Sequence, residues 1–445
     1  MNIGLISLGC CKNRVDSEVM LYRLKKAGHR LVSQPEKADL IIVNTCAFIE
    51  DARQEAIDKL LAAGQLKSGG QLKYLVAAGC LAQRYNKYLL EEMPELDALV
   101  GISHCDEIDK IVEQIQAGQR VIACREAGGE SRPSGGRVLT TPKGMAYLRI
   151  ADGCDNHCTY CAIPGIRGAL RSKPLPQLIQ EASRLVAREQ IRELVVIAQD
   201  TAAYGMDLYA EKALPALLDG LQNIEGLEWI RLMYLHPAHM DETLIEAVAS
   251  HDKVLPYLDV PVQHVSDRVL SAMNRRHDSL HLLNLMARLK ERLPGLVLRT
   301  TVMTGFPGES EDDFKLLSDF VAETGFDWLG AFCYNPEEGT AAASMPDQVP
   351  DEVKAERLDS VMKLQKRITR GKNIARIGSR HKVLITAKVA SQLYMGRGYY
   401  QAPEVDGITM VRSTRTLPLG QFAKAELKAV KNYDMIGEAE DESSQ

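Results

Sequence analysis

The first part of the chain alternates short apolar runs with segments whose apolar residues recur every three or four positions. The runs and the segments that follow them cover residues 2–8 and 15–26, 39–43 and 50–63, and 72–78 and 85–92. Apolar runs of this length predict strands, and the longer repeat predicts amphipathic helices. The alternation therefore predicts an α/β domain with a parallel sheet covered by helices.

The same alternation returns in the middle of the chain and continues through six units. The expected strands cover residues 145–150, 193–198, 229–235, 257–262, 296–303 and 328–334. Between the first two, Leu178, Ala182 and Leu185 mark one apolar helix face. Six parallel strands are too few for a closed eight-stranded barrel. We therefore predict an open (β/α)6 barrel with a cleft that admits a large substrate.

The end of the chain has a different pattern. One long charged helix is expected at Asp351–Ala375, after the break at Pro350. Short β-like runs then cover residues 382–389, 407–411 and 422–430, separated by turns. Runs of this kind predict a small five-stranded all-β barrel of the OB type.

We expect three domains from these patterns. Glycines and prolines among charged residues mark a linker between the first two domains. The expected bounds are residues 1–120 for the N-terminal domain, 121–139 for the linker, 140–375 for the open barrel and 377–443 for the tail barrel.

Composition narrows the class of protein. The 445 residues are 45% hydrophobic and 25% charged, as in an ordinary globular protein, and a net charge of −5 gives no global reason to expect nucleic-acid binding. No apolar run approaches the roughly 18 residues of a membrane-spanning helix, and the N-terminus lacks the basic region of a signal peptide. We therefore expect a cytoplasmic protein, in which ten cysteines indicate metal or redox chemistry before disulfides.

Three cysteines stand at C-x3-C-x2-C spacing just after the first barrel strand: Cys154, Cys158 and Cys161. A loop this short can hold three irons of a four-iron cluster. The next cysteine is Cys333, so one iron would stay open for a cofactor or substrate. The alternative is a structural zinc, which needs four ligands and would have to recruit His157. We favour the cluster and expect His157 to line the site without being a ligand.

Cys10, Cys46 and Cys80 each fall just past the end of a predicted strand of the first domain. Ligands bind at that edge of an open parallel sheet, so these thiols can converge on one site. The alternative is three buried core thiols, since free cysteine is often buried. Repetition in three successive units favours a second three-cysteine cluster.

Two further segments end barrel strands on the rim that carries the first cluster. Gln199 follows the second strand, and the turn from Gly305 to Glu309 follows the fifth. Glycines in such a turn permit close approach to a cofactor. The alternative is ordinary turn and cap chemistry, and the position on the rim favours cofactor binding.

Other reactive side chains are assigned no role. Cys105, Cys124 and Cys333 are expected to be ordinary thiols, and the pair His277 and His281 is expected to be solvated. The charges of the tail nearly balance, which favours a protein-docking module over an RNA-binding barrel with a basic stripe. Stacking tyrosines, the RNA alternative, would be Tyr394, Tyr399 and Tyr400.

The three-cysteine loop resembles the signature of the radical S-adenosylmethionine (SAM) enzymes, in which the open iron chelates SAM. In that family the residue before the third cysteine is aromatic and lies near the adenine, which implies that role for Tyr160. The resemblance also implies SAM contacts by Gln199, Gly305 and Glu309.

The whole chain is similar to the methylthiotransferases, which join a second three-cysteine domain, a radical SAM barrel and a C-terminal TRAM domain. Residues 7–13, 44–48 and 78–83 correspond to their three N-terminal ligand motifs. Residues 161–168, 197–201, 336–340, 346–350 and 402–407 are similar to the branch that modifies an aspartate of small-subunit ribosomal protein S-twelve. Two positions depart from the family pattern: Cys11 stands where proline is usual, so that it could replace Cys10 or shuttle sulfur, and Pro336 stands where a polar residue is more frequent.

The resemblance implies two [4Fe-4S] clusters, with SAM bound at the first. A 5′-deoxyadenosyl radical made there would take hydrogen from the β-carbon of the aspartate, and the second cluster would carry the sulfur and accept a methyl group. The implied partners are protein S-twelve, docked through the TRAM domain, and an electron donor such as flavodoxin or ferredoxin. The alternatives are a tRNA adenosine 2-methylthiotransferase, acting on N6-isopentenyl or threonylcarbamoyl adenosine, and a non-catalytic iron–sulfur redox or scaffold protein.

Overall fold

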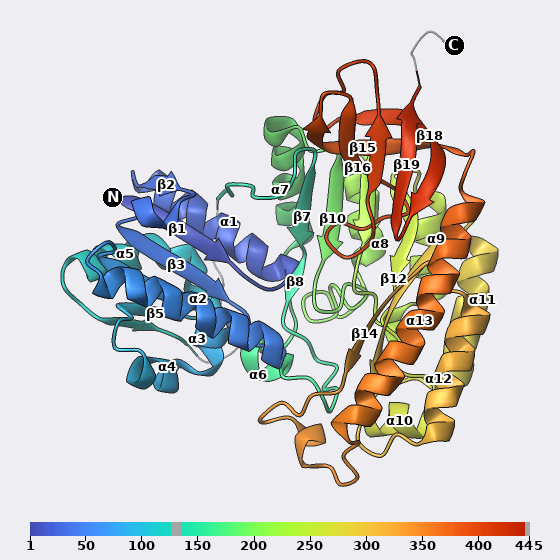
Figure 1. Ribbon diagram of the computed structural model, residues 1–445, viewed down its shortest axis with the longest axis horizontal. Helices are drawn as coiled ribbons and strands as arrows, with labels where there is room; N and C mark the ends of the chain where they lie inside the picture. The colour runs from blue at the N-terminus through green and yellow to red at the C-terminus, as the bar shows by residue number, and fades with distance from the viewer. Residues whose placement is uncertain (126–134, 441–445) are drawn as a thin grey trace.

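The computed structural model describes residues 1–125 and 135–440. Figure 1 shows an N-terminal α/β domain in blue, a larger β/α body beside it and a small β-barrel in red against one end of that body. The expected linker, residues 121–139, and the end of the tail barrel at 443 fall partly on residues 126–134 and 441–445, outside the described residues. The three expected kinds of fold are all present.

The N-terminal domain is built on a six-stranded parallel sheet with the order β2-β1-β3-β4-β5-β6. Its strands are β1 (Asn2–Ser7), β2 (Arg30–Val32), β3 (Leu40–Thr45), β4 (Tyr74–Gly79), β5 (Ala98–Val100) and β6 (Val121–Ala123). Its helices are α1 (Cys11–Lys26), α2 (Glu50–Ser68), α3 (Cys80–Arg84), α4 (Asn86–Glu92) and α5 (Ile108–Gln116). Every residue of β3 is buried, as expected for a central strand with helices on both faces.

The sequence pattern identified β1, β3 and β4 but not β2, β5 and β6. Each of the missed strands has three residues, too few for a hydrophobic period to be visible. Strand β6 lies within the range expected to be linker, so the first residues of that range belong to the N-terminal sheet.

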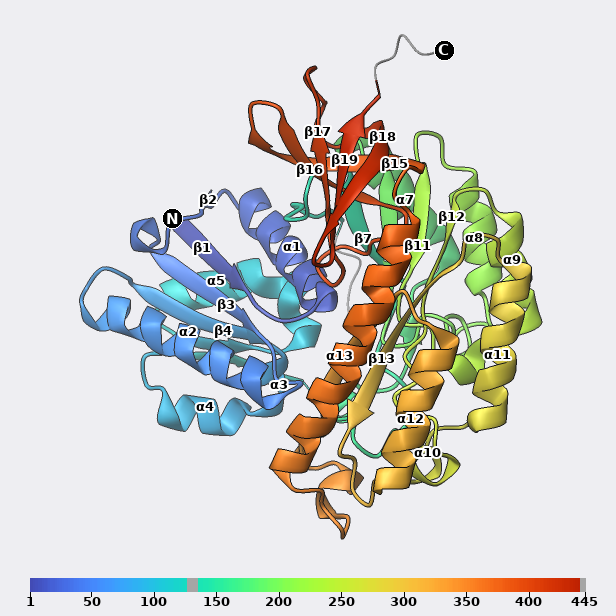
Figure 2. The same cartoon turned by 45° about the vertical axis from the view of Figure 1, so that its right-hand side comes forward.

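The central domain is an open barrel of six parallel strands with the order β14-β13-β12-β11-β10-β7, as predicted. The strands are β7 (Met145–Arg149), β10 (Glu193–Ile197), β11 (Trp229–Leu232), β12 (Val254–Asp259), β13 (Val297–Thr304) and β14 (Trp328–Cys333). The helices are α7 (Leu175–Glu189), α8 (Leu214–Gln222), α9 (Glu242–Ser250), α11 (Ser279–Arg292), α12 (Glu311–Thr324) and α13 (Asp351–Ala375), which pack on the outer face of the sheet (Figure 2). Shorter elements near the cysteine loop are β8 (Ala151–Asp152), α6 (Ile163–Arg167), β9 (Arg171–Ser172) and α10 (Asp267–Ala272).

The tail is a closed five-stranded barrel, as predicted, with the order β15-β16-β17-β19-β18. Its strands are β15 (Arg380–Ala390), β16 (Leu393–Gly398), β17 (Thr409–Arg412), β18 (Phe422–Lys431) and β19 (Asp434–Ala439). Tyr394 and Tyr400 are 1% and 0% exposed, and the Tyr399 hydroxyl donates to the Gly295 carbonyl at 3.2 Å. Tyr394 and Tyr400 are therefore buried too deeply for the RNA-stacking alternative, whereas Tyr399 is partly exposed.

The loop between β16 and β17 enters the interior of the open barrel. Tyr400 and Ala402 pack there with Tyr147 and Tyr257 from the barrel strands. The Tyr257 hydroxyl donates to Asp406 Oδ2 at 2.6 Å. The tail barrel is thus joined to the central domain through its core.

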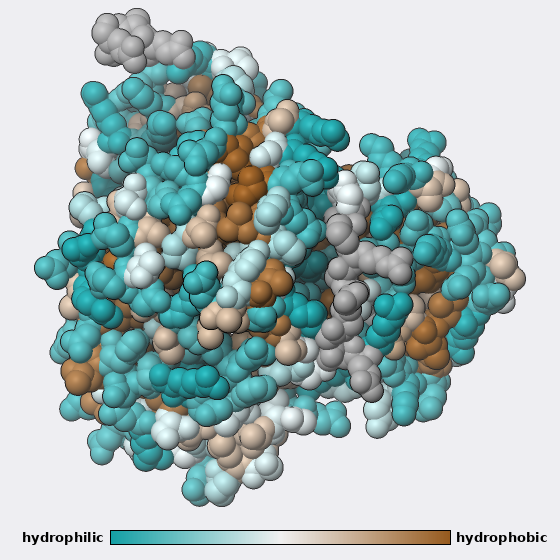
Figure 3. Space-filling model, turned by 180° about the vertical axis from the view of Figure 1, so that it is seen from behind, coloured by the Kyte–Doolittle hydropathy of each residue, from teal (hydrophilic) through white to brown (hydrophobic). Residues whose placement is uncertain are grey.

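The face opposite to Figure 1 carries mostly hydrophilic side chains, with smaller apolar areas between them on both the larger and the smaller body (Figure 3). In the described part of the chain, no helix has the length and hydropathy needed to cross a membrane.

Candidate functional site

The loop that carries Cys154, Cys158 and Cys161 follows β8 at the mouth of the open barrel. Backbone hydrogen bonds hold it: Cys154 N donates to the Gly168 carbonyl at 3.1 Å, and Cys161 N donates to the Cys158 carbonyl at 3.0 Å. All three thiols are partly exposed. The loop therefore presents three sulfur atoms from one short, braced segment.

Burial disfavours the thiolate form of Cys154 and Cys161. It raises the pKa of Cys154 to about 11 and that of Cys161 to about 12. Thiolates at this loop need compensating positive charge, which a bound metal supplies. One built-in cation is Arg275, 8% exposed, whose Nη1 lies 4.0 Å from Cys158 Sγ. Arg275 Nη1 also lies 3.4 Å from the hydroxyl of Tyr160.

His157 lies within the loop but is exposed. Its backbone has a φ of 48°, and its carbonyl accepts a hydrogen bond from Asn274 Nδ2 at 2.9 Å. The residue thus shapes the turn through its main chain. That His157 lines the site without being a ligand stays a prediction.

Cys10, Cys46 and Cys80 come together at one end of the N-terminal sheet. A Cβ atom placed on Gly9 would lie 3.1 Å from Cys46 Sγ, so the two segments touch. Burial, together with the charges of Cys10 and Cys46, raises the pKa of Cys80 to about 12, against the lowering effect of Arg167. The three thiols are thus near neighbours, as the strand-end argument predicts.

Asn13 ties these segments to each other. Its Nδ2 donates to the Thr45 carbonyl at 2.8 Å, and Cys80 Sγ donates to its Oδ1 at 3.5 Å. Asn13 is fully buried on the first turn of α1. It therefore joins the three strand ends that carry the cysteines.

Arg167 of α6 connects the two cysteine sites. Its Nη2 lies 3.7 Å from Cys80 Sγ and 2.8 Å from Asn13 Oδ1, while Nη1 donates to Asp152 Oδ1 at 2.9 Å. Asp16 of α1 lies 3.3 Å away. Arg167 could not be singled out from the sequence, because its only signal is its place in the 161–168 motif.

Cys11 points toward the barrel. Its Sγ lies 3.4 Å from the Tyr234 hydroxyl, and the Lys12 ammonium lies 3.0 Å from the centre of the Tyr234 ring. A pocket of about 250 Å³ lies against Cys10, Cys11 and Tyr234, and the tail residue Glu404 also lines it. Burial raises the pKa of Cys11, which makes it a weak nucleophile.

Gln199 lies beside the first cysteine loop. Its Nε2 donates to Asp152 Oδ1 at 3.1 Å, while its Oε1 is buried and has no partner among the described residues. Next to it, Asn156 Nδ2 lies 3.4 Å from Cys154 Sγ and 2.8 Å from Asp200 Oδ2. Gln199 thus keeps one free acceptor near the loop, as a cofactor ligand would.

The turn from Gly305 to Glu309 is braced internally. Glu309 Oε2 accepts from the Gly305 amide at 2.8 Å, and Oε1 accepts from Arg357 Nη1 at 2.8 Å. Gly305 has a φ of +72°, and an added Cβ would lie 2.1 Å from Lys354 Cγ. The turn brings Phe306 edge-on to Tyr160, with ring centres 6.5 Å apart. SAM contacts by Gly305 and Glu309 stay a prediction.

The three remaining cysteines have local partners. Cys105 Sγ donates to the Gly101 carbonyl at 3.9 Å, and Cys124 Sγ donates to the Ala82 carbonyl at 3.5 Å. Thr304 Oγ1 donates to Cys333 Sγ at 3.9 Å. These contacts are those of structural thiols.

The ring nitrogens of His277 are not solvated, contrary to expectation, whereas His281 is partly exposed. Both nitrogens of His277 are buried, and its ring centre lies 5.5 Å from that of His236 and 5.9 Å from that of His281. His281 Nε2 contacts the Pro237 carbonyl at 3.1 Å. Sequence spacing did not show this, because the segment after β11 supplies the other half of the contact.

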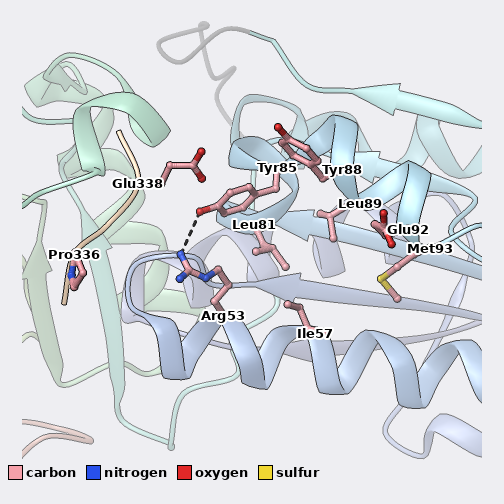
Figure 4. A pocket seen from close by; sticks show the side chains of 10 residues that line it. All are labelled: Arg53, Ile57, Leu81, Tyr85, Tyr88, Leu89, Glu92, Met93, Pro336 and Glu338. Atoms are coloured by element: carbon pink, nitrogen blue, oxygen red, sulfur yellow. Dashed lines mark hydrogen bonds between the residues drawn. The ribbon is translucent and has the colours of Figure 1, made fainter. Parts of the chain in front are cut away.

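A separate pocket of about 430 Å³ lies between the N-terminal domain and the segment after β14 (Figure 4). Its polar contact is the Arg53 guanidinium, which donates to the Tyr85 hydroxyl at 3.2 Å. The described residues that line it carry no thiol: Arg53, Ile57, Leu81, Tyr85, Tyr88, Leu89, Glu92, Met93, Pro336 and Glu338. The pocket is therefore separate from both cysteine sites.

Three family descriptions match successive parts of the chain. Residues 2–101 match the "Uncharacterized protein family UPF0004", residues 148–321 match the "Radical SAM superfamily" and residues 377–439 match the "TRAM domain". The three matches coincide with the three bodies of the fold.

Full-length relatives are also similar. The "Ribosomal protein uS12 methylthiotransferase RimO" of Syntrophomonas wolfei subsp. wolfei (strain DSM 2245B / Goettingen) is 53% identical over 438 residues, covering 98% of this chain and 100% of the relative. The protein of the same name from Clostridioides difficile (strain 630) is 42% identical over 438 residues, covering 98% of each.

Two solved structures share the fold at low identity. The radical SAM methyltransferase TsrM of Kitasatospora setae, with cobalamin and a [4Fe-4S] cluster bound, has a TM-score of 0.56 and 13% identity, covering 77% of this chain and 74% of that one. The cobalamin-dependent SAM radical enzyme OxsB has a TM-score of 0.51 and 14% identity, covering 82% and 56%. At these identities the likeness shows the fold alone.

Proposed function

Because the chain belongs to the RimO family of radical SAM methylthiotransferases, we propose that it inserts a methylthio group at the β-carbon of an aspartate of ribosomal protein uS12. The observation that carries the proposal is the pair of three-cysteine sites on adjacent domains. Arg167 contacts a thiol of one site and the carboxylate beside the loop of the other. An enzyme that makes a radical and delivers sulfur to it needs two such centres close together.

The donor sets suit two [4Fe-4S] clusters. Each site offers three thiols, and three thiolates leave one iron of a four-iron cluster open. Each site also has a buried arginine near one sulfur, Arg275 near Cys158 and Arg167 near Cys80. A guanidinium there stabilises the negative charge of a thiolate-bound cluster.

When bound, the cluster on Cys154, Cys158 and Cys161 would supply the electron that cleaves SAM, and the cluster on Cys10, Cys46 and Cys80 would supply the sulfur. The chain's own residues position the reactants. Tyr160 lies between Arg275 and Phe306 and would line the adenine, and the unpartnered Oε1 of Gln199 would accept from the amino group of SAM. The barrel walls keep water from the radical.

Two features favour a protein substrate over tRNA. The tail barrel buries Tyr394 and Tyr400, so neither presents a ring to a base. Its charges also nearly balance, whereas an RNA-binding surface needs excess positive charge. We therefore assign the tail to docking of uS12. The electron donor of this proposal is a flavodoxin or ferredoxin.

Mass spectrometry of uS12 and nucleoside analysis of tRNA, from cells with and without the gene, test this proposal. We expect one aspartate peptide of uS12 to be about 46 Da lighter without the gene, the mass of a methylthio group replacing hydrogen. An unchanged uS12 together with loss of methylthio-adenosine from tRNA would contradict the proposal. Purified, reconstituted enzyme should methylthiolate recombinant uS12 when SAM, sulfide and a reductant are added.

A further inference from the structure

Asp200 and two histidines meet beside the first cysteine loop. Asp200 follows β10, and His236 and His239 follow β11. His239 Nδ1 lies 2.6 Å from Asp200 Oδ2, and the His236 amide donates to Asp200 Oδ1 at 3.4 Å. Asn156 connects the group to the loop, since its Nδ2 contacts both Asp200 and Cys154 Sγ. The histidines thus lie at the barrel mouth, beside the three-cysteine loop.

His236 carries a buried hydrogen-bond donor that has no acceptor. Its Nδ1 accepts from the Ala238 amide at 3.3 Å, so the neutral ring has its proton on Nε2. That Nε2 is buried and has no partner among the described residues, and the residue is only 9% exposed. A buried N–H without an acceptor is costly and calls for a ligand.

His277 repeats this feature from the opposite side. Its ring meets His236 edge-on at 71°, and neither of its nitrogens has a partner among the described residues. Burial and the positive charge of Arg275 lower the pKa of both rings, that of His277 to about 3. Each imidazole is therefore neutral and keeps one N–H to donate.

The surrounding charge favours an anion with oxygen acceptors. Arg275 and Arg276 lower the pKa of His236, which places their positive charge nearby. The negative charge of Asp200 is already engaged by Asn156 and His239. A metal ion is disfavoured, because two ligand atoms on one tetrahedral metal lie about 3.3 Å apart. The 2.6 Å separation of His239 Nδ1 and Asp200 Oδ2 is that of a hydrogen bond.

We propose that His236 and His277 form a subsite for a carboxylate, with Asp200 and His239 as positioning residues. The carboxylate belongs either to the methionyl part of SAM or to the aspartate of the protein substrate. The subsite rests on the proposed function, which brings both groups to this mouth. It gives the enzyme a means to hold one reactant by its charge while leaving the neighbouring carbon free.

Equilibrium binding to reconstituted, oxidised enzyme tests the subsite, because SAM is not cleaved without a reductant. Two ligand pairs are compared: SAM with decarboxylated SAM, and uS12 with uS12 whose target aspartate is replaced by asparagine. His236→Asn removes the Nε2 donor and keeps the acceptor for Ala238, whereas His236→Gln keeps a donor near Nε2. His277→Phe removes both nitrogens and keeps a ring. His251→Gln is the control, since His251 pairs with Asp219 at 2.8 Å elsewhere on the domain.

We expect His236→Asn and His277→Phe to weaken binding of one carboxylate ligand by about 10- to 100-fold, as for loss of a hydrogen bond to a charged group. The carboxylate-free partner of that pair should bind the variants and the wild type alike, and His236→Gln should recover part of the loss. The pair that shows this coupling identifies the source of the carboxylate. Iron content and thermal unfolding of each variant, compared with wild type, separate loss of binding from misfolding.

Two results would overturn the subsite. One is that, in variants with wild-type iron content, the loss of affinity for the carboxylate ligand exceeds that for its carboxylate-free partner by less than about twofold in both ligand pairs. The other is a metal ion beyond the cluster iron that elemental analysis finds in wild type and that is lost in the histidine variants. If wild-type enzyme does not methylthiolate uS12, the proposed function fails, and the SAM pair alone decides the subsite.

Discussion

The two cysteine sites each contain three thiols but are built differently. Cys154, Cys158 and Cys161 lie on one loop, whose shape depends on hydrogen bonds within the central domain. Cys10, Cys46 and Cys80 lie at the start of α1, after β3 and at the start of α3. The first site is thus local, whereas the second exists only when the N-terminal sheet is folded.

The surroundings of the two sites differ in the same way. Arg275, the cation of the loop site, comes from the same domain and donates to the Pro261 carbonyl at 2.6 Å. Arg167, the cation of the sheet-edge site, comes from the neighbouring domain. The tail also reaches this second site, because Glu404 pairs with Arg14 of α1 at 2.8 Å. The second site therefore depends on all three domains, and it should be the easier one to disturb from a distance.

The largest expected effect comes from the cysteines themselves. Alanine at Cys154, Cys158 or Cys161 should abolish reductive cleavage of SAM, because the cluster that would donate the electron loses one of its three thiolates. Alanine at Cys10, Cys46 or Cys80 should leave SAM cleavage intact and stop sulfur insertion. Chromatography of 5′-deoxyadenosine and mass spectrometry of uS12 measure the two steps separately.

The matched control is Cys124→Ala, a thiol whose partner is a backbone carbonyl. It should retain both steps and the iron content of wild type. Loss of SAM cleavage in the N-terminal variants would contradict the division of labour between the two sites. Cys11→Ala extends the test, since sulfur insertion that persists in this variant would exclude Cys11 as a required ligand or sulfur carrier.

The second prediction compares the two arginines. Arg167→Met removes one of the two arginines that pair with Asp16 and Asp152, and leaves Arg149 to pair with both. Breaking a buried ion pair from one side costs about 3–5 kcal/mol when no other cation remains, so this variant should lose less than that. We expect a lower thermal midpoint and loss of the second cluster, seen as roughly half the wild-type iron. Arg275→Met should instead retain the second cluster and change the spectrum of the first.

Electron paramagnetic resonance of the reduced proteins distinguishes these outcomes. Arg167→Lys is the conservative variant, which keeps the positive charge but lacks the two guanidinium nitrogens that contact Asn13 and Asp152. Intermediate stability for this variant would support the ion network. Equal loss of both clusters in Arg167→Met and Arg275→Met would show that the two sites are not supported independently.

The sequence revealed the periodic features of the fold and the local site, for physical reasons. Six barrel strands and the tail barrel could be predicted because their hydrophobic periods are long enough to recognise. Cys10, Cys46 and Cys80 could be placed together because strand ends of a parallel sheet share an edge. The role of Arg167 and the burial of His277 could not, because both depend on side chains that meet across domains or across barrel strands.

The third prediction concerns the tail loop that supports the second site. Burial raises the pKa of Asp406 from 3.8 to about 6, against the lowering effect of Arg299. The folded state therefore binds this proton more tightly than the unfolded state, and its contribution to stability falls as pH rises through 6. Between pH 5 and 7 we expect wild type to lose about 1 kcal/mol relative to Asp406→Asn.

Urea unfolding of both proteins at pH 5, 6 and 7 measures this difference. Asparagine keeps an oxygen acceptor for the Tyr257 hydroxyl and the Ala402 amide. The variant should thus fold normally and lack the pH dependence. A free-energy difference that stays constant across this range would show that Asp406 titrates in the folded protein as it does in the unfolded one.

The smallest expected effect is that of the contact between the tail and α1. Arg14 and Glu404 have side chains 31% and 41% exposed, so solvent screens their pair and Glu404→Gln should cost only about 0.5 kcal/mol. The Tyr147 hydroxyl donates to Glu404 Oε2 at 3.1 Å, and glutamine can still accept that bond. We expect an unchanged first cluster and a slightly faster loss of the second to a chelator at low salt, followed by absorbance, with the difference from wild type vanishing at high salt. A faster loss of the first cluster would instead show that the tail supports both sites equally, and the asymmetry between them would then lie in the arginines alone.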